Sequence, residues 1–384
     1  MKEIREIIKA FDLAQKEGKQ TALATVVQVE GSSYRSPGAR MLITEDGALT
    51  GAISGGCLEG DALRKAQLVM FQQQSMLVTY DTTDDDDAKF GVGLGCNGII
   101  HILIEPIRPE QENHPIALLK RCLADRRDQV LVTVFDLKNK RSAQVGTCLL
   151  WNKQVVSGSW EGLQGIKTSL MEDVKDAFAS GSSIINRYNI VSPLHAFIEV
   201  IKPPIELVII GAGNDAIPLA ELANILGWGI TLVDGRADYA NVQRFPKAQQ
   251  IILAKADQVV SQISWDARTV VVLMTHNYNY DLTVLKHLLP IKVSYLGVLG
   301  PKKKMTKMID ALEKESIKPT EQDLRKIFGP IGLDIGAEAP EEIALSVIAE
   351  IKAVLEGKPG TFLRDKSGPI HSRDAVRLTL SDSK

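Results

Sequence analysis

The residues best suited to chemistry lie in a glycine-rich segment, residues 31–64. Within it, Cys57 follows Gly55 and Gly56 and precedes apolar residues that recur at roughly helical spacing. The free amide groups and the dipole of a helix N-terminus stabilise anions and lower the pKa of a thiol. We therefore expect Cys57 to lie in the first turn of a helix, where it can act as a thiolate, a nucleophile or a metal ligand.

The residues around this cysteine bear on its role. Glycine turns also occur where a free cysteine is only a small buried apolar side chain, which is the plainer alternative for Cys57. The upstream residues Arg35 and Arg40 favour a ligand site instead, because guanidinium groups pair with phosphate. Cys96 also lies among glycines, so the two cysteines can approach one ligand.

A second candidate site begins at Gly211. The sequence GAGNDA has GxGxxA spacing where a predicted strand turns into a helix, and Asp234 ends the next predicted strand. In a dinucleotide site, glycines such as Gly211 and Gly213 let the backbone approach the pyrophosphate, and the acidic residue bonds a ribose hydroxyl. The pattern predicts a Rossmann-like domain and makes NAD(P) a candidate ligand, with Arg236 leaving NADP open as well as NAD.

Two more predicted strand ends face the same crevice, because ligands of open α/β sheets bind beyond the carboxyl ends of the strands. His276 follows one of these strands and can act as a general acid or base. A run of lysines that starts at Lys302 follows the other and can meet a phosphate. The simpler alternatives are a histidine that caps a loop and a solvated basic turn.

Composition excludes several classes of protein. The 384 residues suffice for two or three domains with separate cores. A charged content of 24% and a formal net charge of −2 provide no basic surplus for nucleic acid. No apolar run approaches the roughly 20 residues that span a bilayer, so we expect no membrane segment. The four cysteines form no CxxC pair, which predicts neither a zinc knuckle nor a disulfide framework and favours a reduced, cytoplasmic location.

The order of predicted elements gives an α/β chain with two domains. Residues 1–203 mix helices with short strands, and we expect a mixed α+β domain there that carries the cysteine loop. Paired prolines then mark a boundary, after which long apolar strands alternate with helices. Residues 204–357 are predicted to form a Rossmann-like, doubly wound parallel sheet, and residues 358–384 a polar tail. We find no internal repeat in the sequence.

Several motifs together resemble the XdhC/CoxI family, the accessory proteins of xanthine dehydrogenase and related molybdenum hydroxylases. The likeness covers both halves of the chain in order, which makes it more specific than any single motif. The motifs are GSSYRSPGARM, SGGCLE, GLGCNG, GAGNDA, THNYNYD, YLGVLGPKKK and PIGLDIGAEAPEEIALSVIAEI.

The resemblance implies a cytoplasmic protein that binds molybdenum cofactor, supports its sulfuration and delivers it to the apo-hydroxylase in purine catabolism. The motif cysteine of the family corresponds to Cys57. A phosphate and a dithiolene-bound metal suit arginines, amides and a soft thiolate. We therefore expect Arg35 and Arg40 to pair with phosphate or pterin, Cys57 to contact molybdenum or the incoming sulfur, and Cys96 to line the same pocket.

The expected partners are a xanthine dehydrogenase-type hydroxylase, a cysteine desulfurase and a second copy of this chain in a homodimer. In one respect the chain departs from the family pattern: many relatives have histidine where it has Asn214, which removes a titratable group from the crevice. Two other functions fit the same sequence. One is an NAD(P)-dependent oxidoreductase in which His276 moves a proton, and the other is a structural component of a hydroxylase complex.

Overall fold

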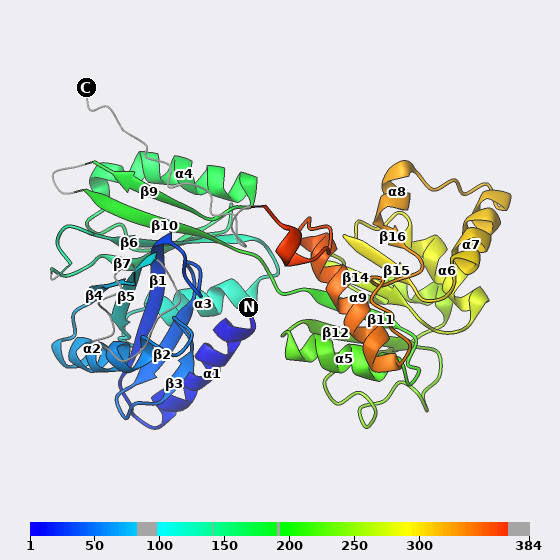
Figure 1. Ribbon diagram of the computed structural model, residues 1–384, viewed down its shortest axis with the longest axis horizontal. Helices are drawn as coiled ribbons and strands as arrows, with labels where there is room; N and C mark the ends of the chain where they lie inside the picture. Colours follow the sequence, from blue (N-terminus) through cyan, green and yellow to red (C-terminus); the bar gives the residue numbers. More distant parts are fainter. Residues whose placement is uncertain (83–97, 141, 190–192, 368–384) are drawn as a thin grey trace. The chain divides into compact units, whose positions relative to one another are not determined.

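The chain is represented by a computed structural model that describes residues 1–82, 98–140, 142–189 and 193–367 (Figure 1). Its backbone contacts divide it into two compact units, one holding Glu3–Pro203 and one beginning at Pro204. Among the described residues, no helix has the length and apolar character needed to cross a bilayer.

The first unit contains two halves with one order of elements, a helix, three strands, a second helix and two strands. The first half is α1 (Lys2–Lys16), β1 (Thr21–Gly31), β2 (Arg40–Thr44), β3 (Leu49–Gly51), α2 (Glu59–Gln72), β4 (Met76–Asp81) and β5 (Gly98–Pro106). The second half is α3 (Pro115–Ala124), β6 (Gln129–Phe135), β7 (Gly146–Trp151), β8 (Val156–Gly158), α4 (Lys167–Ser180), β9 (Ile184–Tyr188) and β10 (Leu194–Ile201).

Each half forms a five-stranded antiparallel sheet, and the two sheets have the same strand order. The first sheet runs β3-β2-β1-β5-β4 and the second runs β8-β7-β6-β10-β9. The sequence has no internal repeat that we could find, but the topology of the first unit does repeat. The two halves keep the same arrangement of backbone although their sequences share no evident period, because burial and strand pairing tolerate many different apolar side chains.

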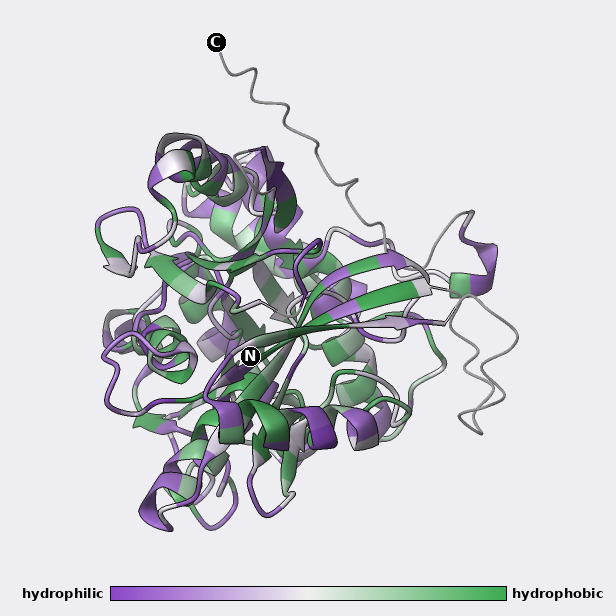
Figure 2. Cartoon of the chain, turned by 90° about the vertical axis from the view of Figure 1, so that its left-hand side faces the viewer, coloured by the Kyte–Doolittle hydropathy of each residue, from purple (hydrophilic) through white to green (hydrophobic). Residues whose placement is uncertain are grey.

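The sheets face each other, and each has a helix on its outer face (Figure 1). Between the sheets, Ile7 of α1 and Leu119 of α3 pack in one cluster with Leu23 and Leu131 from the two central strands. On the outer faces, α2 packs against the first sheet and α4 against the second. Hydrophobic and hydrophilic residues alternate along the helices in Figure 2, as amphipathic helices on a sheet require.

The second unit is a doubly wound sheet. Its elements are β11 (Glu206–Ile210), α5 (Ala216–Ile225), β12 (Gly229–Asp234), β13 (Gln250–Leu253), β14 (Thr269–Leu273), α6 (Tyr278–Leu288), β15 (Tyr295–Val298), α7 (Lys302–Lys314), α8 (Glu321–Lys326), β16 (Ile327–Phe328) and α9 (Pro340–Leu355).

All six strands of this sheet are parallel, in the order β13-β12-β11-β14-β15-β16. This is the strand order of Rossmann dinucleotide-binding domains, with the switch point between β11 and β14. Helices α5 and α9 cover one face, and α6 and α7 cover the other. The predicted fold class, a mixed α+β part followed by a Rossmann-like sheet, is confirmed, although the two-residue strand β16 was missed.

Candidate functional site

The loop around Cys57 connects β3 to α2 in the first unit. The thiol is exposed, which contradicts the alternative of a buried apolar side chain. The helix starts at Glu59, with Leu58 as its N-cap residue. Cys57 therefore lies just before the helix and not in its first turn, because the chain after Gly56 needs two more residues to reach helical geometry.

A carboxylate of the protein occupies the anion position at the start of α2. Glu59 accepts hydrogen bonds from the backbone amides of Ser54, at 2.9 Å, and Leu58, at 3.1 Å, and also from the Ser54 hydroxyl. Burial alone would raise the pKa of the Glu59 carboxyl, but the hydrogen bonds from Ser54 outweigh burial and hold the pKa below its usual value. Glu59 thus fixes the loop through its bonds to Ser54 and Leu58, and the Cys57 side chain takes no part in these hydrogen bonds.

The two glycines before the cysteine have different surroundings. Gly56 has φ +113, a conformation that favours glycine, and a Cβ placed on it would meet no heavy atom within 4 Å. Gly55 lies under the ring of Tyr34, whose atoms would be 3.6 to 3.8 Å from a Cβ at that position. Tyr34 is 71% exposed. The result is an open turn with a thiol and an exposed aromatic ring on the same surface.

The two predicted arginines have different environments. Arg35 follows Tyr34 in the sequence and pairs with Glu3 of α1. Its side chain is partly exposed, so a ligand in solvent can reach it. Arg40 is only 2% exposed, and its guanidinium pairs with both carboxylate oxygens of Glu199 in β10. In this conformation Arg40 is engaged inside the protein as a link between the two sheets. We retain Arg35 in the candidate site and assign Arg40 a structural role.

Two other predictions fall on residues outside the described ranges. These are Cys96, with its glycine-rich loop, and the acidic run at residues 84–87. The part of the chain that the structure describes contains no cluster of three or more His, Cys, Asp or Glu side chains that would hold a metal ion.

In the second unit, the glycine turn predicted from the sequence lies between β11 and α5. Gly211 has φ +117, and a Cβ on it would lie 2.5 Å from the carbonyl carbon of Met274, so only glycine fits where β11 and β14 diverge. Gly213 is less restricted, because a Cβ there would overlap an oxygen of the Asp215 side chain, which can move, and not backbone. That carboxylate belongs to the N-cap residue of α5, where a dinucleotide would place its pyrophosphate.

The acidic residue of the fingerprint already has partners. One Asp234 oxygen accepts the Ala212 amide at 2.8 Å, and the Arg236 guanidinium donates to both oxygens at 2.9 and 2.8 Å. Burial tends to raise the pKa of Asp234, but the hydrogen bonds from Arg236 and Ala212 hold it below its usual value. Arg236 also stacks on Tyr239, 4.0 Å from the ring centre. A ribose hydroxyl would have to displace Arg236 to reach Asp234.

His276 borders a cavity of about 620 Å³ at the carboxyl ends of the strands. Its Nε2 lies 2.7 Å from an Asp215 oxygen, and its φ of +57 is uncommon for a residue other than glycine. Lys302 does not line this cavity. The lysines that do are Lys303, Lys304 and Lys307, of which Lys304 is paired with Asp281 at 2.7 Å.

Three residues of these sites were not predicted from the sequence. Tyr34 could have been noted as the one aromatic side chain in a loop of small residues beside Arg35. Glu59 is two residues after Cys57, where acidic residues favour a helix N-terminus. Asp215 is the third variable residue of GAGNDA, and no sequence pattern indicates that it pairs with His276, because these residues are 61 positions apart.

Known proteins share both of these regions with the chain. The family model described as the XdhC and CoxI family matches residues 14–81, and the XdhC Rossmann domain matches residues 207–351. A protein of Bacillus subtilis (strain 168), named as one of the probable subunits of xanthine dehydrogenase, is 32% identical over 343 residues, which cover 89% of this chain and 95% of that protein. This chain belongs to the XdhC and CoxI family.

Two further relatives span most of this XdhC and CoxI family member. The "Molybdenum cofactor insertion chaperone PaoD" of Escherichia coli (strain K12) is 25% identical over 91% of this chain and 88% of its own length. A crystal structure described as a xanthine dehydrogenase from Bacillus halodurans is 28% identical, with a TM-score of 0.74 over 92% of this chain and 96% of that one. Both the Cys57 loop and the Gly211 turn lie inside the regions matched by the family models.

Proposed function

We propose that this protein is an accessory factor that binds molybdenum cofactor in the cytoplasm and delivers it to a xanthine dehydrogenase-type hydroxylase. The observation that carries the proposal is the exposed Cys57 thiol on an open glycine turn inside the family-matched region. The names of the relatives support it, since one is a molybdenum cofactor insertion chaperone and another is a probable component of xanthine dehydrogenase.

The cargo accounts for the residue types of the loop. Molybdopterin presents a planar pterin, a phosphate and a dithiolene-bound metal, and soft metal centres favour thiolate ligands. In our proposal, Cys57 contacts the molybdenum or the sulfur that is being added to it, and Arg35 exchanges its ion pair with Glu3 for the phosphate. The exposed ring of Tyr34 offers a stacking face for the pterin.

The role in sulfuration extends the same proposal. A cysteine desulfurase would supply sulfur at the Cys57 turn, and the hydroxylase would then receive the completed cofactor. A homodimer would place two such turns in one particle. The support for these partners is the family membership together with the accessibility of the thiol.

A dinucleotide is not needed for this function, and the second unit fits it poorly. Asp234 is already bonded by Arg236, and the Asp215 carboxylate lies at the helix N-terminus where a pyrophosphate would bind. Two negative groups at that place repel each other. The residues present therefore do not fit NAD(P) in the manner that the fingerprint predicts, and we assign it no step.

The test uses protein purified from cells that make molybdenum cofactor. Cys57→Ala is expected to lower the bound molybdenum at least tenfold and to abolish activation of the apo-hydroxylase, because the cargo loses its soft ligand. The matched control is Cys148→Ala, which removes a buried thiol far from solvent and should retain both properties. Metal analysis and hydroxylase activity are the measurements. A Cys57→Ala protein that still holds cofactor and still activates the hydroxylase would refute the role of Cys57.

A further inference from the structure

The two halves of the first unit place a glutamate at the same position of the last strand. Glu105 in β5 is paired in register with Leu23, the third residue of β1. Glu199 in β10 is paired with Leu131, the third residue of β6. The two carboxylates are therefore equivalent under the repeated topology.

The partner strands are equivalent as well, but they carry different residues. Arg40 of β2 is paired with the fifth residue of β1, and Thr147 of β7 with the fifth residue of β6. Arg40 directs its guanidinium onto Glu199, with Nη1 3.1 Å from Oε1 and Nη2 bonded to the other oxygen. At the second position the shorter Thr147 donates to Glu105 through its amide at 2.7 Å and its hydroxyl at 2.8 Å.

Because Thr147 has a shorter side chain than Arg40 and no charge, Glu105 has no cation beside it among the residues that the structure describes. Glu105 is only 4% exposed and makes no ion pair with any residue in the described ranges. Burial raises the pKa of the Glu105 carboxyl, against the hydrogen bonds from Thr147 and the more distant charge of Arg40. A carboxylate has about four acceptor positions, and Thr147 uses one on each oxygen, so capacity for two donors is left.

A cavity of about 280 Å³ lies at this position and is lined by both Glu105 and Thr147. Its wall also carries the side chains of Gln74 and Gln111, which can bond a polar ring. Three further polar side chains of the wall already have internal partners: Asn113 accepts from Arg121, His114 from the Ala117 amide and Gln144 from the Asp136 amide. Burial lowers the pKa of His114, and its Nδ1 accepts the Ala117 amide at 3.3 Å, so the Nε2–H group is the one left to donate to a ligand. The volume lies just below the usual range for small-molecule pockets and suits a ligand the size of one base.

We propose that this cavity binds a small planar ring that presents two adjacent N–H donors to Glu105, as the guanidinium of Arg40 does to Glu199. The 2-amino-pyrimidin-4-one edge has this geometry, and guanine and pterin both carry it. Such an edge reproduces the paired donors of a guanidinium without its charge. The carboxamides of Gln74 and Gln111 then bond the remaining ring atoms.

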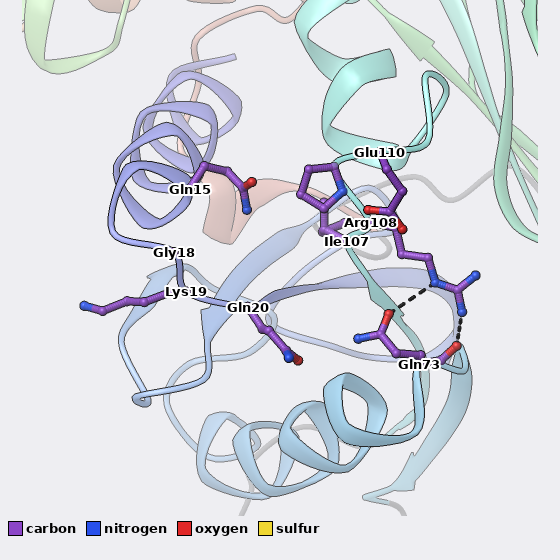
Figure 3. A pocket seen from close by; sticks show the side chains of 9 residues that line it. Gln15, Gly18, Lys19, Gln20, Gln73, Ile107, Arg108 and Glu110 are labelled. Atoms are coloured by element: carbon purple, nitrogen blue, oxygen red, sulfur yellow. Dashed lines mark hydrogen bonds between the residues drawn. The ribbon is translucent and has the colours of Figure 1, made fainter.

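The neighbouring cavity in Figure 3 does not share these features. Arg108 and Gln73 line both cavities, and Arg108 Nε donates to the side-chain oxygen of Gln73 at 3.2 Å (Figure 3). The cavity in the figure contains Lys19, which is already paired with Glu17 at 2.6 Å and Asp46 at 2.7 Å. It has no buried charged side chain among its lining residues. A ligand there would only exchange hydrogen bonds with water for similar bonds to exposed groups, which contributes little to binding.

The Glu105 cavity is separate from the Cys57 turn. Cys57 precedes α2 and Gln74 follows it, and the 14 residues of this helix span about 21 Å. One pterin cofactor cannot reach from the thiol to the cavity. The inference is thus independent of the proposed delivery function, and Cys57→Ala should leave binding at Glu105 unchanged.

The test is calorimetric titration of the full chain with guanosine, with pterin and with adenosine, which lacks the donor pair. Guanosine or pterin should bind and adenosine should not. Binding of both indicates that only the shared edge is recognised, and binding of one identifies the source. Glu105→Gln should weaken binding at least tenfold, because the amide replaces one acceptor with a donor. The matched control Glu110→Gln changes an exposed carboxyl on the neighbouring cavity and should have no effect.

A second variant keeps the inference testable if Glu105→Gln folds poorly. Thr147→Arg supplies the guanidinium that the first half already has, so it should fill the cavity, abolish binding and leave the fold intact. Circular dichroism reports the fold of both variants. The inference is overturned if neither guanosine nor pterin binds the wild-type chain, if adenosine binds equally well, or if Thr147→Arg binds as the wild type does.

Discussion

Arg40 is the residue whose environment says most about how the first unit is held together. Its guanidinium is buried, with 2% of the side chain exposed, and it bonds both oxygens of Glu199 across the two sheets. Its amide also donates to Glu3 of α1 at 3.2 Å. A buried ion pair matters to stability mainly because removal of one partner leaves the other charge unpaired.

Arg40→Met should therefore lower the free energy of unfolding of the first unit by about 3–5 kcal/mol, the usual effect of breaking a buried pair. The double variant Arg40→Met with Glu199→Leu should recover most of this loss, since no buried charge is left. Arg64→Met is the matched control, because Arg64 is 71% exposed in its pair with Asp61 and should cost less than about 1 kcal/mol. Urea unfolding followed by circular dichroism measures all three, and equal midpoints for Arg40→Met and Arg64→Met would contradict the assignment.

Residue chemistry could be predicted only where it is local in sequence. The Cys57 loop was predicted from the spacing of its glycines, and the exposed thiol is compatible with a ligand-binding role, which stays a prediction. The sequence predicts a phosphate-binding Arg40 and does not reveal its buried partner Glu199, which is 159 positions away. Whether an arginine faces a ligand or a buried carboxylate depends on which strands meet, and spacing along one strand does not contain that information.

Among the elements, the turn between β11 and α5 depends on a glycine for two reasons. Gly211 has φ +117, and its missing Cβ lets the end of β14 pass at 2.5 Å from that position. Gly56 in the Cys57 loop has a similar φ of +113, but the space around it is open. Substitution of Gly56 by alanine therefore costs only the unfavourable backbone conformation, whereas substitution of Gly211 also costs the steric overlap with β14.

Gly211→Ala should destabilise the second unit clearly more than Gly56→Ala destabilises the first. Both variants bear the conformational cost of a sparsely populated backbone region, about 1–3 kcal/mol, and only Gly211→Ala also forces β11 and β14 apart. Thermal unfolding of each variant, followed by calorimetry, provides the comparison. Equal losses of stability in the two variants would show that the close approach of β14 is not what restricts this turn.

The elements of the second unit were easier to predict than those of the first. Long apolar strands such as β11 and β14 are buried on both faces, so they appear in the sequence as continuous runs bounded by glycine and polar residues. The two-residue strand β16 has no such run. In the first unit, α2 was predicted to include Cys57 in its first turn, but it begins at Glu59. The helical spacing of apolar residues does not show where the hydrogen bonds of Glu59 end the loop.

On the scale of the whole molecule, each strand pair and each core cluster of the described residues belongs to one unit or the other. The two antiparallel sheets and four of the clusters use residues up to Ile201, and the parallel sheet and the other two clusters use residues from Ile205. We propose that domains end and begin at residues 203 and 204. Each part is large enough to bury a core of its own.

Residues 1–203 and residues 204–384, expressed separately, should each fold cooperatively. Single-transition thermal unfolding and dispersed amide signals in NMR spectra are the measurements. The Arg40→Met substitution should affect only the first fragment and Gly211→Ala only the second. A fragment that lacks a cooperative transition would show that its core is incomplete without the rest of the chain.

The matching halves of the first unit also suggest how such a protein arose. Two chains of about half its length, each with one helix-flanked sheet, would pair face to face around a two-fold axis and bury both inner helices. Tandem fusion of the gene for such a homodimer yields the strand orders seen in both sheets. In such a fused chain the two equivalent carboxylates need not keep the same partner: Glu199 bonds the guanidinium of Arg40, whereas Glu105 bonds only the amide and hydroxyl of Thr147.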